Sequence, residues 1–521
     1  MRSEAIRSTN KELAYFNLKQ LQSLNVKTIC VCPGARNSPW IELLESQNTF
    51  EVLRFFDERS AGFFALSRAK ETLAPVAVAT TSGTAVGELL PAMMEAYYSG
   101  SKLIALTADR PRRFRGTGAP QACEQKDIFG IYARTSSDLD GESDFTELEA
   151  VEFPFHLNVC FEEPLPSHDS NRFIKKETED KNFKMGEFPL LIVGELSFLE
   201  AQELTPALVL AGLPVITEAL SQLRENPALE TIRIRPHRNL WKEAHDSGYP
   251  IDSVIRIGGV PTLRFWRDLE VHPEASLIPV ASLSTLPFRG LPRASLISQN
   301  ASRWLEKNLE SRHHTSRWNK SFENFKMKQD NRFKHLEVCL KNYPLSEPAW
   351  MRSLSLEIKA GSSVYLGNSL PIREWDMAAT QASKHFLVRA NRGLNGIDGQ
   401  ISSFFGGLRP DCENWAILGD LTALYDSSAP WILNQLHSQP HFKLVIINNS
   451  GGRIFDRIFS SSFYANNHSL GFGDWAKQWG LSHATASDPR LLSALSSSVK
   501  VVEVIPDAEQ TESFWAEWER E

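Results

Sequence analysis

Cysteine is scarce in this chain, and the few cysteines are scattered. The six among 521 residues are Cys30, Cys32, Cys123, Cys160, Cys339 and Cys412, and most have apolar neighbours. Only Cys30 and Cys32 lie close together, and no second cysteine or histidine pair follows them at the spacing of a zinc site. We therefore expect the cysteines to be small buried hydrophobic residues rather than metal ligands.

The sequence also lacks long apolar runs and an excess of basic residues. No stretch approaches the roughly 18 consecutive apolar residues of a membrane-spanning helix, and the first ten residues have no apolar signal-peptide core. The 56 Lys and Arg and 63 Asp and Glu residues give a net charge of −7, which argues against general affinity for nucleic acid or anionic membranes. We expect a cytoplasmic protein in which local arginines bind any anion.

The length and the pattern of apolar segments predict a multidomain α/β protein. Apolar strands alternate with helical stretches, which is typical of parallel sheets covered by helices. In the middle region we expect strands at 190–193, 208–210, 254–257 and 277–280, then a polar helical stretch at 302–340 with His313 and His314 on a solvated face. A charged run at 175–181 marks a boundary. We expect three consecutive α/β domains, at residues 1–178, 186–335 and 345–521.

Polar residues follow two apolar strands in the last region. The strand that begins at Trp415 ends in Gly419-Asp420, and the strand 444–447 runs into Asn448-Asn449 and a glycine-rich loop. Ligands of open parallel sheets bind at such strand ends, and carboxylate and amide oxygens suit magnesium. The pattern predicts a metal-diphosphate anchor. The alternative is a simple turn followed by a glycine-rich loop.

The N-terminal region places a second set of polar residues after strands. The strand 27–32 leads into a Pro-Gly turn with Arg36, where backbone N–H groups and a fixed positive charge can meet a ligand. Glu58 falls at a strand–helix junction, where a carboxyl can be partly buried and its pKa raised. The alternatives are a solvated arginine in a plain turn and an acid favoured by the helix dipole.

Further strand ends carry arginines. The strand 75–80 is followed by 81–85, which we expect to open one long helix as far as residue 98, and the strand 102–107 leads to Arg110. Arginines at 110, 112, 113 and 115 form a basic loop, which predicts a carboxylate clamp in which one or two of them are only solvated. The strands 363–366 and 386–389 precede loops with Arg373 and Arg392.

These motifs occur in an order that resembles one family of thiamine-diphosphate enzymes. Pro-Gly-Ala-Arg at 33–36, the segments 57–63, 81–85 and 107–111, the Gln121 loop and the closing strand 153–159 resemble the pyrimidine-binding domain of MenD. That family makes 2-succinyl-5-enolpyruvyl-6-hydroxy-3-cyclohexene-1-carboxylate in menaquinone biosynthesis. The Gly-Asp and Asn-Asn pair resembles the diphosphate motif of the same enzymes, and Leu421 after Gly-Asp is MenD-like.

The resemblance implies a cofactor site. Thiamine diphosphate is expected, with Mg²⁺ or Mn²⁺ held by Asp420, the Asn449 side chain and the Gly451 carbonyl. Glu58 is expected to bind N1′ of the aminopyrimidine, and Ile397 to support the bent cofactor. The remaining expected cofactor contacts are Gly419, Leu421, Ile454 and Phe455, although plain core packing is the alternative for the last two.

The resemblance also implies the substrates and the assembly. Both 2-oxoglutarate and isochorismate are dicarboxylates, which the arginines 36, 110, 373 and 392 can bind, with Gln121 and Ser369 beside them. Ala35 and Pro120 depart from the family pattern, in which we expect Ser and Asn. A homodimer or homotetramer with sites at the subunit interface is implied. Two alternatives remain: a different thiamine-diphosphate decarboxylase or carboligase, and a silent ligand-sensing member.

Overall fold

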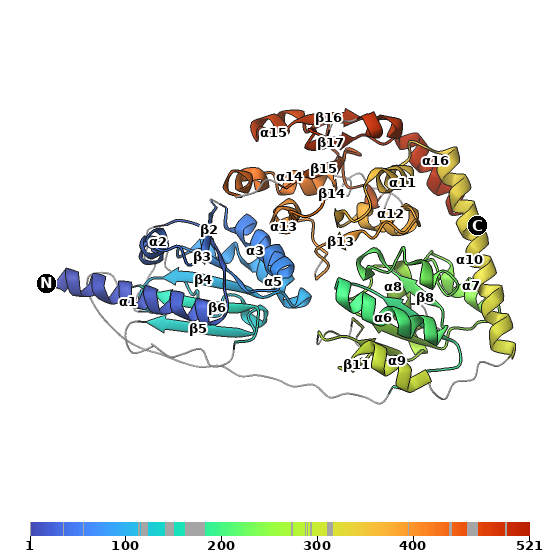
Figure 1. Ribbon diagram of the computed structural model, residues 1–521, viewed down its shortest axis with the longest axis horizontal. Helices are drawn as coiled ribbons and strands as arrows, with labels where there is room; N and C mark the ends of the chain where they lie inside the picture. Colours follow the sequence, from blue (N-terminus) through green and yellow to red (C-terminus); the bar gives the residue numbers. More distant parts are fainter. Residues whose placement is uncertain are drawn as a thin grey trace. The chain divides into compact units, whose positions relative to one another are not determined.

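The computed structural model contains three parallel sheets flanked by helices (Figure 1). It describes residues 2–34, 36–55, 57–112, 115, 123–140, 151–161, 183–271, 275–286, 288, 290–291, 294–309, 316–393, 395–436, 440–455, 467–494 and 497–520. Contacts divide the chain into two compact units. The first comprises Met1–Lys176, Gly393–Pro410 and Thr422–Gln439, and the second comprises Glu177–Arg392, Asp411–Leu421 and Pro440–Glu521.

The first unit is built on a six-stranded sheet of order β2-β1-β3-β4-β6-β5, in which every neighbouring pair is parallel. Its strands are β1 (Thr28–Val31), β2 (Glu51–Arg54), β3 (Val76–Thr80), β4 (Leu103–Asp109), β5 (Thr135–Asp140) and β6 (Phe155–Cys160). The helices of this unit include α1 (Arg2–Ser23), α2 (Ser38–Glu45), α3 (Glu58–Thr72), α4 (Thr84–Gly87), α5 (Leu90–Ser99) and α13 (Gln400–Gly406). The central strands are continuous apolar runs because both faces of the sheet are buried.

The expected N-terminal strands are confirmed to within a few residues, but one expected helix is wrong. Residues 81–98 form two helices, α4 and α5, rather than one. Pro91 lies in the first turn of α5, where proline is tolerated, whereas further inside a helix it would break the hydrogen-bonding pattern. The strand β5 was not expected, because its sequence Thr-Ser-Ser-Asp-Leu-Asp is largely polar and only partly buried.

The second unit contains two parallel sheets, a five-stranded one of order β11-β10-β9-β7-β8 and a six-stranded one of order β13-β12-β14-β15-β17-β16. The first has β7 (Pro189–Val193), β8 (Val215–Thr217), β9 (Ser253–Ile257), β10 (Val280–Leu283) and β11 (Ser295–Ile297); the second has β12 (Ser363–Leu366), β13 (Leu387–Arg389), β14 (Asn414–Gly419), β15 (Phe442–Ile447), β16 (His483–Ala486) and β17 (Val501–Val504). Helices here include α6 (Phe198–Ala211), α7 (Leu240–Asp246), α8 (Arg264–Val271), α9 (Ala301–Leu309), α10 (Ser316–Asn342), α11 (Glu347–Glu357), α12 (Leu370–Ala378), α15 (Gly473–Gln478) and α16 (Ala508–Trp518).

Two strands expected in the middle region are wrong or displaced. Residues 208–210 belong to α6, which begins at a Ser197–Glu200 capping box. Leu208 is buried while Leu210 is 76% exposed, so this apolar triplet follows a helical rather than a strand pattern. Leu277 lies in a short 3₁₀ turn, and the strand begins only at Val280. The helices expected within 302–340 are confirmed as α9 and α10, whereas His313 and His314 lie outside the described residues.

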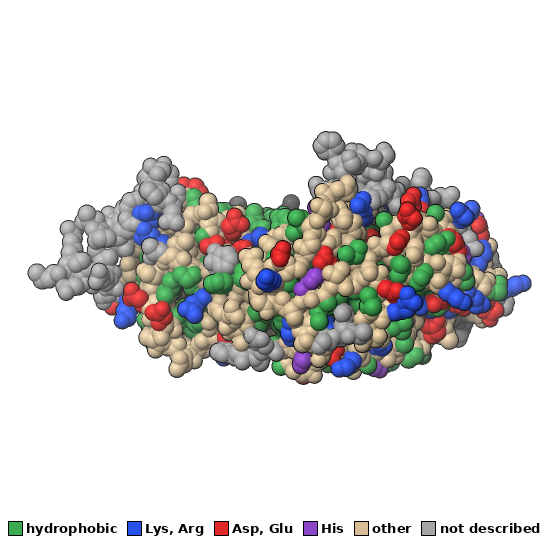
Figure 2. All heavy atoms as spheres, turned by 90° about the horizontal axis from the view of Figure 1, so that it is seen from above, with side chains coloured by type: hydrophobic (Ala, Val, Ile, Leu, Met, Phe, Trp, Pro, Cys, Tyr) green, Lys and Arg blue, Asp and Glu red, His purple; other side chains and the backbone are tan. Residues whose placement is uncertain are grey.

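Each sheet has its own cluster of buried apolar side chains. This arrangement confirms the expected α/β class, while the exact domain boundaries stay predictions. Cys30, Cys32, Cys160 and Cys339 are buried as expected, but Cys123 and Cys412 are partly exposed. Acidic and basic side chains are interspersed on the face shown in Figure 2. Among the described helices, none has the length and apolarity needed to cross a membrane.

Candidate functional site

The predicted metal ligands follow two neighbouring strands of the last sheet and lie at one edge of that sheet. The strands β14 and β15 pair in parallel, with Gly419 opposite Ile447 at their carboxyl ends. Asp420 follows the first strand as the start of α14 (Asp420–Tyr425), and Asn448-Asn449 follow the second. The sequence expectation that these residues share one strand edge is therefore correct.

The carboxylate of Asp420 is buried and held by backbone donors. Its Oδ1 accepts from the Leu421 N–H at 2.6 Å and its Oδ2 from the Gly451 N–H at 2.9 Å. His468 Nε2 lies 3.2 Å from the same Oδ2. Burial raises the pKa of Asp420, while the two backbone donors and His468 oppose that rise. The site thus contains a fixed, desolvated carboxylate that a cation can stabilise.

Asn449 presents an oxygen without a partner. Its Nδ2 donates to Oε1 of Glu347, the buried first residue of α11, at 3.0 Å. Its Oδ1 is buried and has no hydrogen-bond partner among the described residues. A buried polar atom left unsatisfied costs about 1–3 kcal/mol, and a hard divalent cation is the partner that amide and carboxylate oxygens suit. These residues therefore fit a magnesium-type ion.

The loop after β15 is shaped by Asn448 rather than Asn449. Asn448 Nδ2 donates to Glu503 Oε1 at 2.7 Å and to the Leu470 carbonyl at 2.9 Å, and its Oδ1 accepts from Ser450 N at 3.3 Å. Ser450 has φ 63° and Gly451 has φ 143°, a value that glycine tolerates. Sequence reasoning missed this framework because its partners are distant in the chain.

The other expected cofactor contacts lie on the same segments. Gly419 ends β14, Leu421 lies in the first turn of α14, and Ile454 lies in the 3₁₀ turn Arg453–Phe455. Leu421 and Ile454 are partly exposed. The side chain of Phe455 lies outside the described residues. Cofactor contact by these residues stays a prediction.

In the first unit, Glu58 is the first residue of α3, as expected from the strand–helix junction. Asp57 caps this helix by accepting from Ser60 N at 3.1 Å. Glu58 is about half buried, and burial is the main cause of its raised pKa, with Asp57 and Glu88 adding to the effect and its own backbone N–H opposing it. A carboxyl with a raised pKa at a strand end is suited to proton exchange.

Asp426 is a partner of the Glu58 helix that the sequence did not reveal. It is fully buried, accepts from Ser402 N at 2.7 Å and lies 3.7 Å from Arg59. Its Oδ1 also accepts from the Ser60 hydroxyl at 3.4 Å. Burial raises the pKa of Asp426 to about 6. These contacts hold the first turn of α3 and thereby position Glu58.

The helix α13 packs directly on α3 through glycines. A Cβ on Gly406 would lie 2.4 Å from the Phe64 carbonyl oxygen, and one on Gly399 would lie 2.0 Å from the Phe63 ring. No larger residue fits this close approach. Ile397 lies just before α13 in the same unit as Glu58 and is partly exposed.

Close side-chain contacts hold two turns of the N-terminal region. A Cβ on Gly34 would lie 2.5 Å from the Thr81 side chain, so the Pro-Gly turn depends on glycine. Gly83 N donates to Gln125 Oε1 at 2.8 Å, and fully buried Gln125 donates in turn to the Ala108 carbonyl at 3.0 Å. Ala35, Pro120 and the candidate Gln121 lie outside the described residues.

The predicted arginine clamp is smaller than the sequence suggested. Arg115 pairs with Asp109 at 2.9 Å and with Asp138 at 2.7 Å, and Arg112 pairs with Asp138 at 3.0 Å. These two arginines are therefore engaged in internal ion pairs rather than solvated or held ready for substrate. Arg113 lies outside the described residues.

The other two arginines of the first unit remain candidates. Arg110 directly follows β4, and it is partly exposed. Arg36 is also partly exposed, and its Nη1 donates to the Phe161 carbonyl at 3.4 Å.

Two more arginines follow the neighbouring strands β12 and β13. Ser369 precedes α12 with φ 72°, and its carbonyl accepts from the Nη1 of exposed Arg373. Arg392 is buried and donates to Asn368 Oδ1. Asn368 in turn donates to the Asn391 carbonyl at 2.8 Å. The structure thus fixes the guanidinium of Arg392 at this strand edge.

Comparison with known proteins identifies the family. Residues 13–128 match the model of the thiamine pyrophosphate enzyme N-terminal TPP binding domain. The 2-succinyl-5-enolpyruvyl-6-hydroxy-3-cyclohexene-1-carboxylate synthase of Bdellovibrio bacteriovorus is 39% identical over 98% of this chain and 99% of its own length. The enzyme of the same name from Akkermansia muciniphila is 38% identical over 93% of this chain and 94% of its own. The chain therefore belongs to the 2-succinyl-5-enolpyruvyl-6-hydroxy-3-cyclohexene-1-carboxylate synthase family of thiamine pyrophosphate enzymes.

Proposed function

We propose that this protein is a thiamine-diphosphate-dependent decarboxylating carboligase of menaquinone biosynthesis. It joins the succinyl-semialdehyde unit of 2-oxoglutarate to isochorismate, releases CO₂ and forms 2-succinyl-5-enolpyruvyl-6-hydroxy-3-cyclohexene-1-carboxylate. Near-complete coverage of relatives with that name supports the reaction. The observation that carries the cofactor anchor is the buried, unpartnered Oδ1 of Asn449, two residues before the glycine N–H that binds Asp420.

Thiamine diphosphate, when bound, supplies the nucleophilic carbon and the electron sink for decarboxylation. The chain's own task is to hold and tune it. Asp420, the Asn449 side chain and the Gly451 carbonyl would hold Mg²⁺ or Mn²⁺, which binds the diphosphate. The carboxyl of Glu58 would exchange a proton with N1′ of the aminopyrimidine, and its raised pKa supports that role. Ile397 would support the bound cofactor.

Substrate recognition rests on four arginines. Both substrates are dicarboxylates, and Arg36, Arg110, Arg373 and Arg392 supply compensating charge. The fixed position of Arg392 beside Asn368 supports this assignment. Ser369 and Gln121 complete the proposed substrate contacts. Arg112 and Arg115 are not part of this set, because internal carboxylates already neutralise them.

The family resemblance also implies an assembly. Thiamine-diphosphate sites typically join the pyrimidine domain of one subunit to the diphosphate domain of another, so we propose a homodimer or homotetramer. Sedimentation of the purified chain tests this, and an active monomer would contradict it. A cytoplasmic location remains a prediction.

One assay separates this function from its alternatives. With thiamine diphosphate, Mg²⁺, 2-oxoglutarate and isochorismate, we expect CO₂ release coupled to product formation. Replacing 2-oxoglutarate with pyruvate removes one carboxylate and should lower turnover strongly. Equal turnover with pyruvate would favour another carboligase. Cofactor binding without any turnover would favour a silent ligand-sensing member.

A further inference from the structure

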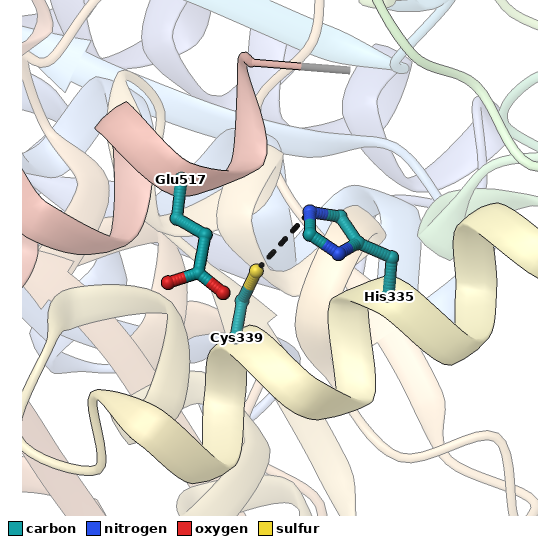
Figure 3. Close-up of side chains that lie close together, drawn as sticks. All are labelled: His335, Cys339 and Glu517. Atoms are coloured by element: carbon teal, nitrogen blue, oxygen red, sulfur yellow. Dashed lines mark hydrogen bonds between the residues drawn. The ribbon is translucent and has the colours of Figure 1, made fainter.

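Three side chains of different metal-ligating types converge in the second unit, outside the proposed active site. His335 and Cys339 lie one turn apart on α10, and Glu517 reaches them from α16 (Figure 3). His335 Nε2 lies 3.5 Å from Cys339 Sγ. A ring nitrogen of His335, the sulfur of Cys339 and a carboxylate oxygen of Glu517 all lie within 4.8 Å of one another.

Neighbouring residues hold these groups in place. The Tyr343 hydroxyl donates to Glu517 Oε2 at 2.8 Å. The His335 ring stacks on Trp518 with centroids 5.8 Å apart and planes 13° apart. Cys339 is fully buried. Partners that orient a ligand's side chain are characteristic of metal sites, where they tune affinity.

A second cluster in the first unit shows what distinguishes this one. Asp109, Asp138 and Cys160 are also close together, but Arg115 donates to all three, at 2.9, 2.7 and 3.3 Å. There the protein supplies its own cation. In the part of the chain that the structure describes, Glu517 has no ion pair with a lysine or arginine, and its carboxylate accepts hydrogen bonds from neutral groups, the Tyr343 hydroxyl and Asn342 Nδ2.

We propose that His335, Cys339 and Glu517 bind a divalent cation of the zinc class, with water in the fourth position. Thiolate and imidazole select zinc or cobalt over magnesium, which prefers oxygen ligands alone. Zinc bonds are about 2.0–2.3 Å long, so the three ligand atoms draw together on binding. The Cys339 thiol gives up its proton to solvent as the metal–sulfur bond forms. The bound metal would tie α16 to α10.

Cobalt chloride is the sharpest probe, because a thiolate ligand gives a near-ultraviolet charge-transfer band that an oxygen-only site does not. The full-length protein is titrated with Co²⁺ in excess Mg²⁺, without thiamine diphosphate. We expect a saturable band at one equivalent per chain, lost on addition of Zn²⁺ and unaffected by more Mg²⁺. The same zinc should raise the melting temperature of the wild type.

Variants connect the signal to the cluster. Cys339→Ser should abolish the band, whereas Cys412→Ser, at a partly exposed cysteine elsewhere, should keep it. Because Cys339 is buried, its variant can fail to fold, so His335→Gln and Glu517→Gln provide independent tests. Each should weaken Co²⁺ binding at least about tenfold. A wild type without the band, or a band that survives in folded Cys339→Ser or is unchanged in both other variants, would overturn the proposal.

Discussion

Glu347 Oε1 accepts the hydrogen bond of the Asn449 side-chain amide at 3.0 Å, and this contact decides which end of that amide is left for a cation. With its nitrogen engaged, Asn449 can turn only its oxygen to the metal. The two residues lie 102 positions apart in the chain. Glu347 is therefore a positioning residue for the proposed metal site.

Removing Glu347 should weaken metal-dependent cofactor binding. In Glu347→Ala the Asn449 amide loses its orienting partner, so we expect the Mg²⁺ concentration needed for half-maximal thiamine-diphosphate binding to rise about 10–100-fold. Calorimetric titration with Mg²⁺ varied measures this. The exposed Glu357 of the same helix provides the control, and Glu357→Ala should bind as the wild type does. Unchanged Mg²⁺ dependence in Glu347→Ala would contradict the orienting role.

Asp420→Ala should lose metal-dependent thiamine-diphosphate binding outright, because it removes the buried carboxylate of the site. Fluorescence or calorimetric titration of the cofactor in the presence of Mg²⁺ provides the measurement. Asp474→Ala, at an exposed acid of α15, serves as the matched variant and should bind normally. If Asp420→Ala kept wild-type cofactor affinity, the anchor assignment would be wrong.

Glu58→Gln should abolish carboligation while leaving cofactor and metal binding intact. Glutamine keeps the shape of the side chain but cannot exchange a proton with N1′. Turnover and cofactor affinity are measured on the same preparation. Glu88→Gln is the control, because it removes a carboxylate whose charge acts on Glu58 without removing the proposed acid. Retained turnover in Glu58→Gln would exclude that acid from the mechanism.

Arg373→Ala should raise the KM for a dicarboxylate substrate. A hydrogen bond to a charged group contributes about 1.5–3 kcal/mol, so we expect roughly a tenfold to hundredfold rise. Steady-state kinetics with each substrate varied in turn shows which one the arginine binds. Arg490→Ala, at an exposed arginine paired with Asp488, should leave both KM values unchanged. An unaltered KM for both substrates in Arg373→Ala would remove Arg373 from the substrate site.

Asp426 should make the stability of the protein depend on pH. Burial raises the pKa of Asp426 to about 6, whereas an unfolded aspartate has a pKa of about 3.9. A carboxyl whose pKa is raised by folding stabilises the protein fully at pH values below its pKa in the unfolded chain. This stabilisation is lost as the pH rises through its pKa in the folded protein. Relative to Asp426→Asn, the free energy of unfolding of the wild type should therefore fall by about 1.4 kcal/mol per pH unit between about pH 4 and pH 6.

Urea denaturation of both proteins across that range measures the difference, which should level off above about pH 6. Asp474→Asn is the control, because its exposed side chain should leave the pH profile parallel to that of the wild type. A wild type that gained stability over Asp426→Asn as pH rose would indicate a charged, well-paired Asp426 instead.

The sequence predicted a residue's position best where a local sequence pattern determines that position. Largely apolar strands ending in polar residues predicted the places of Asp420 and Asn449, because parallel strands end at one sheet edge. It did not predict contacts between residues that are far apart in the chain and that only the fold brings together. Gln125 and Gly83 lie 42 positions apart, and Asp426 and Ser60 lie 366 apart, so no window of sequence contains either contact.

One error had a more local cause, and one cluster of side chains was not anticipated. The triplet 208–210 has the composition of a short buried strand, and only the capping box at Ser197 shows that a helix includes it. The cysteine expectation considered Cys30 and Cys32 and overlooked His335 and Cys339, whose helical spacing places them on one face. Their third partner, Glu517, is supplied by the C-terminal helix, which no spacing rule connects to them.

The division of the first unit into three separate stretches of chain also constrains how it can be synthesised. Its last segment, Thr422–Gln439, is separated from Met1–Lys176 by almost half of the chain. At an elongation rate of roughly 5–20 residues per second, an interval on the order of ten seconds or more separates them. During this time the nascent α3 lacks α13, so Phe63 and Phe64 have not yet gained that cover. An apolar face of α3 is therefore exposed during synthesis, and a chaperone can bind it before the unit is complete.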